Sequence, residues 1–450
     1  MASVYFLSLG CDKNLVDAEC MLGLLRQAGH DFTDDPNEAE VIIVNTCSFI
    51  GDAKEESIAA ILEMAGLRGK GRLKALIATG CMTQRYRNEI LRELPELDAV
   101  LGTSSYQHIA EAVEKALQRC EKGTEPVCYF EDVNKLPLVR ERILTAGGTS
   151  AYLKIAEGCD KYCTYCAIPF VRGRYRSVPK EELVRQAENL AAQGVKELIL
   201  VAQETTLYGT DLYGRKALPE LLAALEEIPG IRWIRLLYGY PEELTDEMID
   251  TMAGSRKLCH YLDLPIQHAA DTVLARMGRK TTQADLRQLI AKLREKIPDI
   301  ALRTTLMCGF PGETEEEHAE NLKFLSEIRF DRLGVFAYSR EEGTAAYRMK
   351  GQIPKRTKEK RRRELMLAQQ KVAFEKAREA VGRTLEVLVE GYLPDDNVYV
   401  GRTYMDAPDV DGYLFFESAG ELESGRIVTV RVTDAREYDL IGVRCDESAE

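Results

Sequence analysis

Apolar runs alternate with amphipathic stretches through the first hundred residues of the chain. Three of these runs each end shortly before a cysteine: Val4 to Leu9 before Cys11, Val41 to Val44 before Cys47, and Leu73 to Ala78 before Cys81. The stretches at 14–28, 53–65 and 83–94 have the period of amphipathic helices, so the pattern predicts a parallel sheet with helical crossovers. Ligands of such sheets bind beyond the carboxyl ends of the strands, and we expect the three cysteines at that edge.

A second alternating pattern begins near residue 149. Strand-like runs occupy 151–157, 197–202, 231–237, 261–264, 300–307 and 333–338, with helical stretches at about 179–193, 218–228, 245–254, 282–296 and 315–328. Thr314-x-x-Glu317 has the pattern of a capping box at the start of the last helix. Six such units predict an open six-stranded version of the (β/α) barrel that eight units would close.

A long helix and a β-rich segment complete the chain. The stretch 357–380 lacks Gly and Pro and predicts a linking helix, and four β-rich runs after it predict a small antiparallel barrel: Leu385 to Val389, Val398 to Gly401, Tyr413 to Phe416 and Ile427 to Val432. The expected fold is therefore α/β, with an N-terminal parallel α/β domain at 1–120, a linker at 121–148, the open barrel at 149–356, the linking helix at 357–380 and the small barrel at 381–447.

The composition is that of a globular enzyme, with 45% hydrophobic and 30% charged residues and no apolar run long enough to cross a membrane. Because the N-terminus has neither a basic region nor a small-residue cleavage site, we expect a cytoplasmic protein. Twelve cysteines in such a protein favour metal ligation or thiol chemistry over disulfides. The net charge is −13, and the part from Glu379 onward carries 17 Asp and Glu against 6 Arg and no Lys, a net of −11.

The densest chemical signal follows the first barrel strand. Cys159, Cys163 and Cys166 form a C-x3-C-x2-C loop, and three thiolates in a short loop suit an iron-sulfur cluster that keeps one iron open to a small chelating molecule. With Tyr165 before the last cysteine, the loop resembles the signature of radical S-adenosylmethionine (SAM) enzymes. The alternative is a zinc site, which usually has four ligands in paired C-x2-C motifs.

The other cysteines carry less information by themselves. For Cys11, Cys47 and Cys81, the residues leave open a second metal site or small buried side chains at tight turns. The six that remain are expected to be structural: Cys20, Cys120, Cys128, Cys259, Cys308 and Cys445.

A set of motifs that spans nearly the whole chain resembles the radical SAM methylthiotransferase family. The set comprises Ser8-Leu9-Gly10-Cys11-Asp12-Lys13-Asn14, Asn45-Thr46-Cys47, Thr79-Gly80-Cys81, the C-x3-C-x2-C loop, Arg303-Thr304-Thr305 and Gly309-Phe310-Pro311-Gly312-Glu313. The C-terminal barrel resembles the TRAM domain of that family. The resemblance implies two 4Fe-4S clusters, with the second on Cys11, Cys47 and Cys81. It also implies that one SAM supplies a radical and another a methyl group, while the second cluster carries the sulfur to be inserted.

Four further residues, with Tyr165, are expected to bind SAM. By the family pattern Tyr165 lies beside the adenine, and Gln203 or Glu204 contacts the amino group or ribose. Arg303 is expected to pair with the carboxylate, and the Gly-Pro turn around Phe310 allows close approach to the cofactor. The alternatives are ordinary packing for Tyr165 and structural ion pairs for Gln203-Glu204 and for Arg303.

The family has two substrate classes, modified adenosines of transfer RNA and an aspartate β-carbon in small-subunit ribosomal protein twelve. The charge of the C-terminal barrel helps to choose between them. RNA binding calls for Lys and Arg, whereas the acidic C-terminal barrel suits a basic ribosomal protein. The motif 406–412, with Asp406, Asp409 and Asp411, also resembles the ribosomal-protein branch, and we expect these aspartates to attract the substrate. The transfer-RNA enzyme is the alternative, and the acidic face could instead serve solubility alone.

The remaining expectations concern partners. The basic cluster at 355–363 could touch ribosomal RNA or be a solvated helix end. We expect a basic ribosomal protein as the substrate, met either free or on the ribosome, and a reductant such as flavodoxin or ferredoxin. We expect no membrane or DNA partner.

Overall fold

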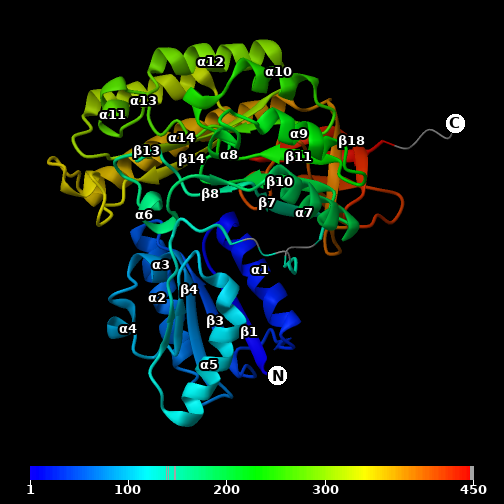
Figure 1. Cartoon of the computed structure of the whole chain (residues 1–450). Helices are drawn as coiled ribbons and strands as arrows, with labels where there is room; N and C mark the ends of the chain where they lie inside the picture. Colours follow the sequence, from blue (N-terminus) through cyan, green and yellow to red (C-terminus); the bar gives the residue numbers. More distant parts are fainter. Residues whose placement is uncertain (138, 140, 146–147, 446–450) are drawn as a thin grey trace. The chain divides into compact units, whose positions relative to one another are not determined.

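The computed structural model describes residues 1–137, 139, 141–145 and 148–445, which form two compact units (Figure 1). The first unit comprises Met1–Thr145, Lys154–Val178 and Ser339–Tyr347. The second comprises Ala146–Leu153, Pro179–Tyr338 and Arg348–Glu450. The C-x3-C-x2-C loop therefore belongs to the same unit as the first three cysteines.

The first unit contains the predicted parallel sheet. Its strand order is β2 (Asp31–Phe32), β1 (Ser3–Ser8), β3 (Val41–Thr46), β4 (Ala75–Gly80), β5 (Ala99–Leu101) and β6 (Val127–Tyr129). Every residue of β3 and β4 is buried, as expected for a parallel sheet covered on both faces. The helices are α1 (Asp12–Gln27), α2 (Gly51–Ala65), α3 (Cys81–Arg85), α4 (Ile90–Glu93) and α5 (Ile109–Lys122), with the short turn η1 (Tyr106–His108) before α5.

Helices cover both faces of this sheet. In Figure 1, α1 and α5 lie on one face, and α2 and α3 lie on the other. Ile42 and Val44 point to the same face of β3, where they pack with Ile61 and Met64 of α2 in one hydrophobic core. One expectation was wrong here: the predicted helix at 83–94 is the two short helices α3 and α4, because residues 86–89 form a turn.

The second unit contains the open six-stranded barrel. Its strand order is β14 (Arg332–Ala337), β13 (Ala301–Cys308), β12 (Leu258–Asp263), β11 (Trp233–Leu236), β10 (Glu197–Val201) and β7 (Ser150–Lys154). Its helices are α7 (Lys180–Ala192), α8 (Thr210–Tyr213), α9 (Leu218–Glu226), α10 (Asp246–Gly254), α11 (Asp271–Arg276), α12 (Gln283–Lys296) and α13 (Glu315–Ile328), with η2 (Pro241–Glu243) before α10. The expected capping box is present at Thr314 and Glu317. The open barrel predicted from the alternation is thus confirmed.

A long helix and a closed barrel follow. Helix α14 (Lys355–Glu379) comes after the turn η3 (Ala346–Arg348) and packs against β14 and α13. The barrel order is β15 (Thr384–Leu393), β16 (Val398–Arg402), β17 (Leu414–Glu417), β19 (Asp439–Arg444) and β18 (Ile427–Arg436). Its pairs are antiparallel except that of β17 with β19. The fifth strand, β19, was not predicted, because its short run contains a glycine and directly follows β18.

The C-terminal barrel packs on the amino ends of the open barrel's strands. Leu388 and Ala407 join Trp233 and Tyr261 in one apolar cluster. Beside it, Glu197 accepts bonds from Arg235 (2.7 Å) and Arg402 (2.6 Å), and all three side chains are fully buried.

The aspartates of the motif 406–412 take part in this packing. Asp406 is buried and forms an ion pair with Arg332, and the Asp411 carboxylate accepts a 2.7 Å bond from the Tyr261 hydroxyl. The expectation that all three aspartates face a basic substrate was therefore wrong. Asp406 and Asp411 instead lie against arginines of the open barrel and help to hold the C-terminal barrel to it within the second unit. Of the three aspartates, only Asp409 is exposed.

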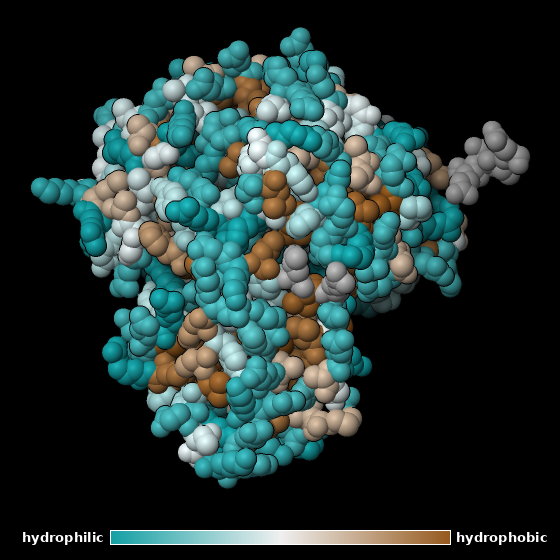
Figure 2. Space-filling model, in the orientation of Figure 1, coloured by the Kyte–Doolittle hydropathy of each residue, from teal (hydrophilic) through white to brown (hydrophobic). Residues whose placement is uncertain are grey.

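Among the described residues, no helix is long and apolar enough to cross a membrane. On the face that Figure 2 shows, hydrophilic side chains predominate, and hydrophobic ones lie in small separate groups.

Candidate iron-sulfur sites

The strand ends of the first unit bring Cys11, Cys47 and Cys81 together. Cys11 directly precedes α1, Cys47 directly follows β3, and Cys81 opens α3 directly after β4. Because β1, β3 and β4 are neighbours in register, the three residues share the carboxyl edge of the sheet. The prediction that they lie at one edge is confirmed.

Two glycines let the backbone turn at this edge. Gly10 has a φ of +102°, and a Cβ placed on it would lie 3.2 Å from the Cys47 sulfur. Gly80 has a φ of +99°, and a Cβ there would collide with the Thr46 backbone. Both positions require the freedom that glycine provides, since an L side chain at positive φ is strained as well as crowded.

Asn14 and Asn45 hold the turns in place. The Asn14 side-chain amide donates to the carbonyl oxygens of Leu9 (3.1 Å) and Thr46 (3.0 Å), and the Asn45 amide donates to the Asn14 carbonyl (2.9 Å). These contacts tie the loop before α1 to the end of β3. Both asparagines belong to the motifs of the sequence, but no structural role had been expected for them.

The thiols of this edge influence one another electrostatically. Burial raises the pKa of Cys81 to about 12, and the neighbouring Cys11 and Cys47 thiols add to the rise. Burial also raises the pKa of Cys47. Cys47 and Cys81 are thus protonated at neutral pH unless a metal displaces their protons, and metal binding to these two thiols must release protons.

The C-x3-C-x2-C loop forms a closed hairpin in the same unit. Strands β8 (Ala156–Glu157) and β9 (Arg176–Ser177) pair at its base, and the short helix α6 (Ile168–Arg172) returns the chain. The Cys159 amide donates to the Gly173 carbonyl (3.2 Å).

The loop sulfurs also lie near one another. The Cys166 amide donates to the Cys163 carbonyl (3.0 Å), and the Ile168 amide approaches the Cys166 sulfur (3.4 Å). Burial raises the pKa of Cys166 to about 12, and Cys163 and Cys159 add to it. Three soft sulfurs, one of which accepts from a backbone N–H, match the donor set of an iron-sulfur cluster.

Neither set resembles a site for a single metal ion. Within the described part of the chain, no group of three or more His, Cys, Asp or Glu side chains converges as such a site requires. Each ligand of a four-iron cluster binds a different iron, so its sulfurs surround the cluster instead of meeting at one point. The three thiol sulfurs of each set are the soft donors that an iron-sulfur cluster takes.

A buried polar network, which sequence reasoning missed, connects the two cysteine sets. Lys154 pairs with Asp17 and with Glu157 (2.7 Å), and Arg172 pairs with Asp17 (2.6 Å) and Glu157 (3.1 Å). Glu157 lies at the base of the loop hairpin, and Asp17 lies in α1 next to the first set. The only signal in the sequence is charge directly beside the motifs, because the partners are far apart along the chain.

The segment Ser339–Tyr347 of the first unit contacts the surroundings of both cysteine sets. Glu341 accepts bonds from Lys54 (2.9 Å) and Arg85 (2.8 Å), which lie in the helices that follow Cys47 and Cys81. The Ala346 amide donates to the Thr164 carbonyl (2.8 Å) within the cysteine loop. Sequence reasoning had placed this segment inside the open barrel.

The other expected SAM contacts are distributed over both units. Tyr165 is half-buried in the loop. In the second unit, Gln203 and Glu204 follow β10, and buried Glu204 accepts a 2.8 Å bond from the Thr206 amide. Phe310 is fully buried, with its ring 5.4 Å from that of Tyr338 in an edge-to-face contact.

Arg303 has protein partners of its own. It forms a 3.0 Å ion pair with Asp263 and lies 3.6 Å from Asp411. This is the structural ion pair that the sequence left open as its alternative. The SAM roles of all five residues stay predictions.

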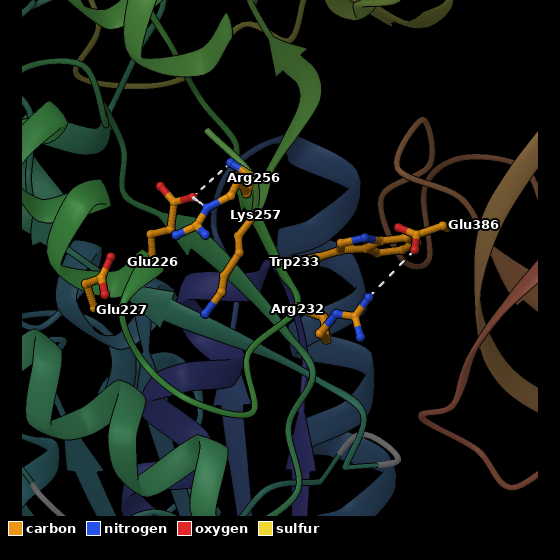
Figure 3. Close-up of a pocket in the computed structure, with 7 residues that line it drawn as sticks. All are labelled: Glu226, Glu227, Arg232, Trp233, Arg256, Lys257 and Glu386. Atoms are coloured by element: carbon orange, nitrogen blue, oxygen red, sulfur yellow. Dashed lines mark hydrogen bonds and ion pairs between the residues drawn. The ribbon is translucent and has the colours of Figure 1, made fainter. Parts of the chain in front are cut away.

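A surface pocket of the second unit lies away from the predicted edge. Figure 3 shows Trp233 and Lys257 at the amino ends of β11 and β12, and a dashed line marks the ion pair between Arg232 and Glu386. The charged atoms of this pair are 3.6 Å apart. Since ligands of parallel sheets bind at the carboxyl ends, this open and strongly charged hollow is not the expected reaction site.

Part of the basic cluster of α14 is paired within the second unit. Arg361 is buried and bonds to Glu313 (3.0 Å) and Glu315 (2.8 Å), and the Lys358 ammonium donates to the Tyr338 carbonyl (2.6 Å). The first turns of this helix are thus partly a packing surface, so a purely solvated helix end does not describe them.

Three family profiles match the chain. The radical SAM superfamily matches residues 153–325, the uncharacterized protein family UPF0004 matches residues 3–102, and the TRAM domain matches residues 381–444. Among solved structures, the radical SAM methyltransferase TsrM of Kitasatospora setae has a TM-score of 0.53 at 14% identity, covering 74% of each chain. At that identity the likeness concerns the fold.

Curated relatives match almost the full length. "Ribosomal protein uS12 methylthiotransferase RimO" of Lachnoclostridium phytofermentans is 58% identical, covering 98% of this chain and 99% of its own. The proteins of the same name from Thermoanaerobacter sp. and Acetivibrio thermocellus are each 49% identical, covering 98% and 99% of this chain and 100% and 99% of their own. With these relatives, the two sets of three cysteines and the closed C-terminal barrel, the chain belongs to the RimO family of radical SAM methylthiotransferases.

Proposed function

We propose that this protein is a radical SAM methylthiotransferase that modifies ribosomal protein uS12, with an aspartate β-carbon as the site of insertion. The observation that carries the proposal is the pair of three-cysteine sets within one unit of a chain whose relatives of that name match over nearly its full length. Transfer RNA, the alternative substrate, is not favoured by these relatives.

We assign one 4Fe-4S cluster to each set of cysteines. Cys159, Cys163 and Cys166 would hold the cluster that binds SAM, and Cys11, Cys47 and Cys81 would hold the other. When bound, the two clusters supply reductive cleavage of SAM to a carbon radical and the sulfur for insertion.

The protein's own residues prepare these sites. Cys159 and Cys163 are buried in the cysteine loop, and Gly10 and Gly80 allow the tight turns that place the first set at the sheet edge. Tyr165, Gln203, Glu204, Arg303 and Phe310 are proposed to contact SAM. Arg303 would have to serve this role while paired with Asp263.

The direct test is modification of uS12 itself. Anaerobically reconstituted protein, incubated with SAM, dithionite and uS12, should add the mass of one methylthio group to an aspartate-containing peptide of uS12. Transfer RNA from a strain without methylthio modification should remain unchanged in the same mixture. Modified transfer RNA with unmodified uS12 would reverse the assignment.

The substrate surface we propose differs from the motif 406–412. Two neighbouring loops of the C-terminal barrel carry exposed acidic side chains: Asp395 and Asp396 between β15 and β16, and Glu421 and Glu423 between β17 and β18. The Ser424 hydroxyl donates to the Glu390 carbonyl (2.9 Å), which ties the second of these loops to strand β15. We call these four residues the acidic loops, and their charge favours a basic protein over RNA.

Reversing the acidic loops to lysine should weaken binding of uS12 and reduce the salt dependence of its dissociation constant, because fewer ion pairs form. Titration calorimetry at several salt concentrations measures both. The control reverses the same number of exposed glutamates on α7, α12 and α13: Glu181, Glu188, Glu295 and Glu320. Equal effects of the two variants would show that net charge alone matters, and an unchanged affinity at low salt would exclude this surface.

We propose that the enzyme meets uS12 in the cytoplasm, either newly made or on the ribosome. We also propose a flavodoxin or a ferredoxin as the reductant.

A further inference from the structure

Arg172 touches both cysteine regions of the first unit from one buried position. Its side chain is 3% exposed, at the end of α6. One guanidinium nitrogen, Nη1, donates to Asp17 (2.6 Å) and Glu157 (3.1 Å). The other, Nη2, donates to the Asn14 side-chain oxygen and to the Cys81 sulfur at 3.4 Å.

The surroundings fix the direction of the bond to sulfur. The Asp17 and Glu157 carboxylates hold one arm of the guanidinium, and Asn14 orients the other. Asn14 is itself anchored by its two bonds to backbone carbonyls, so the arm cannot turn away from Cys81 without breaking several buried bonds. The planar fork of arginine suits this arrangement, whereas lysine presents a single ammonium.

We infer that Arg172 is a positioning residue for the second cluster, and that its N–H bond to the Cys81 sulfur raises the reduction potential of that cluster. The inference rests on the proposed function, which assigns a cluster to Cys11, Cys47 and Cys81. A reduced cluster is more negative than an oxidised one. A nearby positive N–H donor therefore stabilises the reduced form more, as hydrogen bonds to cluster sulfurs generally do.

The same side chain sets where the second cluster lies relative to the cysteine loop. Glu157 directly precedes Gly158 and Cys159, so Arg172 connects the base of that loop to a ligand of the other set through one guanidinium. The arrangement gives one residue both a mechanical and an electrostatic role.

The structure offers a matched control in Lys154. Its ammonium bonds to the same two carboxylates, Asp17 and Glu157, and no hydrogen bond from it to a cysteine sulfur is recorded among the described residues. Arg172→Lys and Lys154→Arg both keep the buried positive charge. Only Arg172→Lys removes the guanidinium nitrogen that donates to the Cys81 sulfur.

The test isolates the second cluster by placing both substitutions in a Cys159/Cys163/Cys166→Ala background. Potentiometric titration followed by electron paramagnetic resonance gives the midpoint potential of the remaining cluster. Arg172→Lys should shift it to a more negative value, and Lys154→Arg should leave it at that of the background protein. An unchanged potential in Arg172→Lys, or equal shifts in both variants, would overturn the inference.

A second measurement needs no substitution of Arg172. The Cys159/Cys163/Cys166→Ala background protein is prepared with isotopically labelled arginine guanidinium nitrogens. Its reduced cluster should show a weak hyperfine coupling to the guanidinium nitrogen of Arg172. If the cluster shows no such coupling, only the role of Arg172 is overturned. If the background protein binds no iron, the assignment of two clusters is overturned as well.

Discussion

Replacing Cys11, Cys47 and Cys81 together with alanine is expected to abolish methylthio transfer to uS12 while SAM is still cleaved. Cleavage needs only the cluster of the loop Cys159 to Cys166, which the substitutions leave intact, whereas insertion needs the sulfur of the second cluster. Formation of 5′-deoxyadenosine and the mass of uS12, measured in one reaction mixture, separate the two steps.

The matched control replaces three other cysteines, Cys120, Cys128 and Cys445, which the sequence predicts to be structural. This variant should keep both reactions. Methylthio transfer that survives loss of the first set would show that its sulfurs are not needed for insertion.

Replacing Glu197 with alanine is expected to lower the free energy of unfolding of the second unit by about 3–5 kcal/mol, the usual effect of leaving a buried charge unpaired. Glu197 neutralises both Arg235 and Arg402, and all three are fully buried. Urea unfolding followed by the fluorescence of Trp233 measures the change, because the chain contains one tryptophan and it lies at the start of β11. Glu386→Ala is the control, since its pair with Arg232 is exposed and should contribute about 0–1 kcal/mol.

The Glu197 carboxyl should also make the free energy of unfolding of the second unit depend on pH in the acid range. Burial alone would raise the pKa of Glu197, but the guanidiniums of Arg402 and Arg235 lower it to about 2, from an ordinary value of 4.5. Its contribution is therefore present at neutral pH and is lost as the pH falls from about 4.5 through 2. A Glu197→Gln variant that loses stability as steeply as the wild type in this range would assign the effect to other carboxyls.

The parts that the sequence predicted well are those with local signals. Strand and helix periods placed the two parallel sheets, and the positions of Cys11, Cys47 and Cys81 directly after apolar runs placed them at one edge. The C-x3-C-x2-C loop needs only its spacing to be recognised. These features depend on residues close together in the chain, which is where sequence patterns are informative.

The parts that it did not predict depend on long-range pairing of charges. Asp406 and Asp411 count toward an acidic domain, but composition does not show that Arg332 and Tyr261 bury them. Likewise Arg172 is one basic residue among many until the fold places it between Glu157 and Cys81. A charged side chain next to a motif indicates a partner without identifying it.

Two separate clusters are expected to occupy the two sets of cysteines. The iron and sulfide content of anaerobically reconstituted wild type should be roughly eight irons per chain, falling to about four when Cys159, Cys163 and Cys166 are replaced by alanine. About four irons in the wild type and none in this variant would contradict the claim and leave Cys11, Cys47 and Cys81 as structural residues.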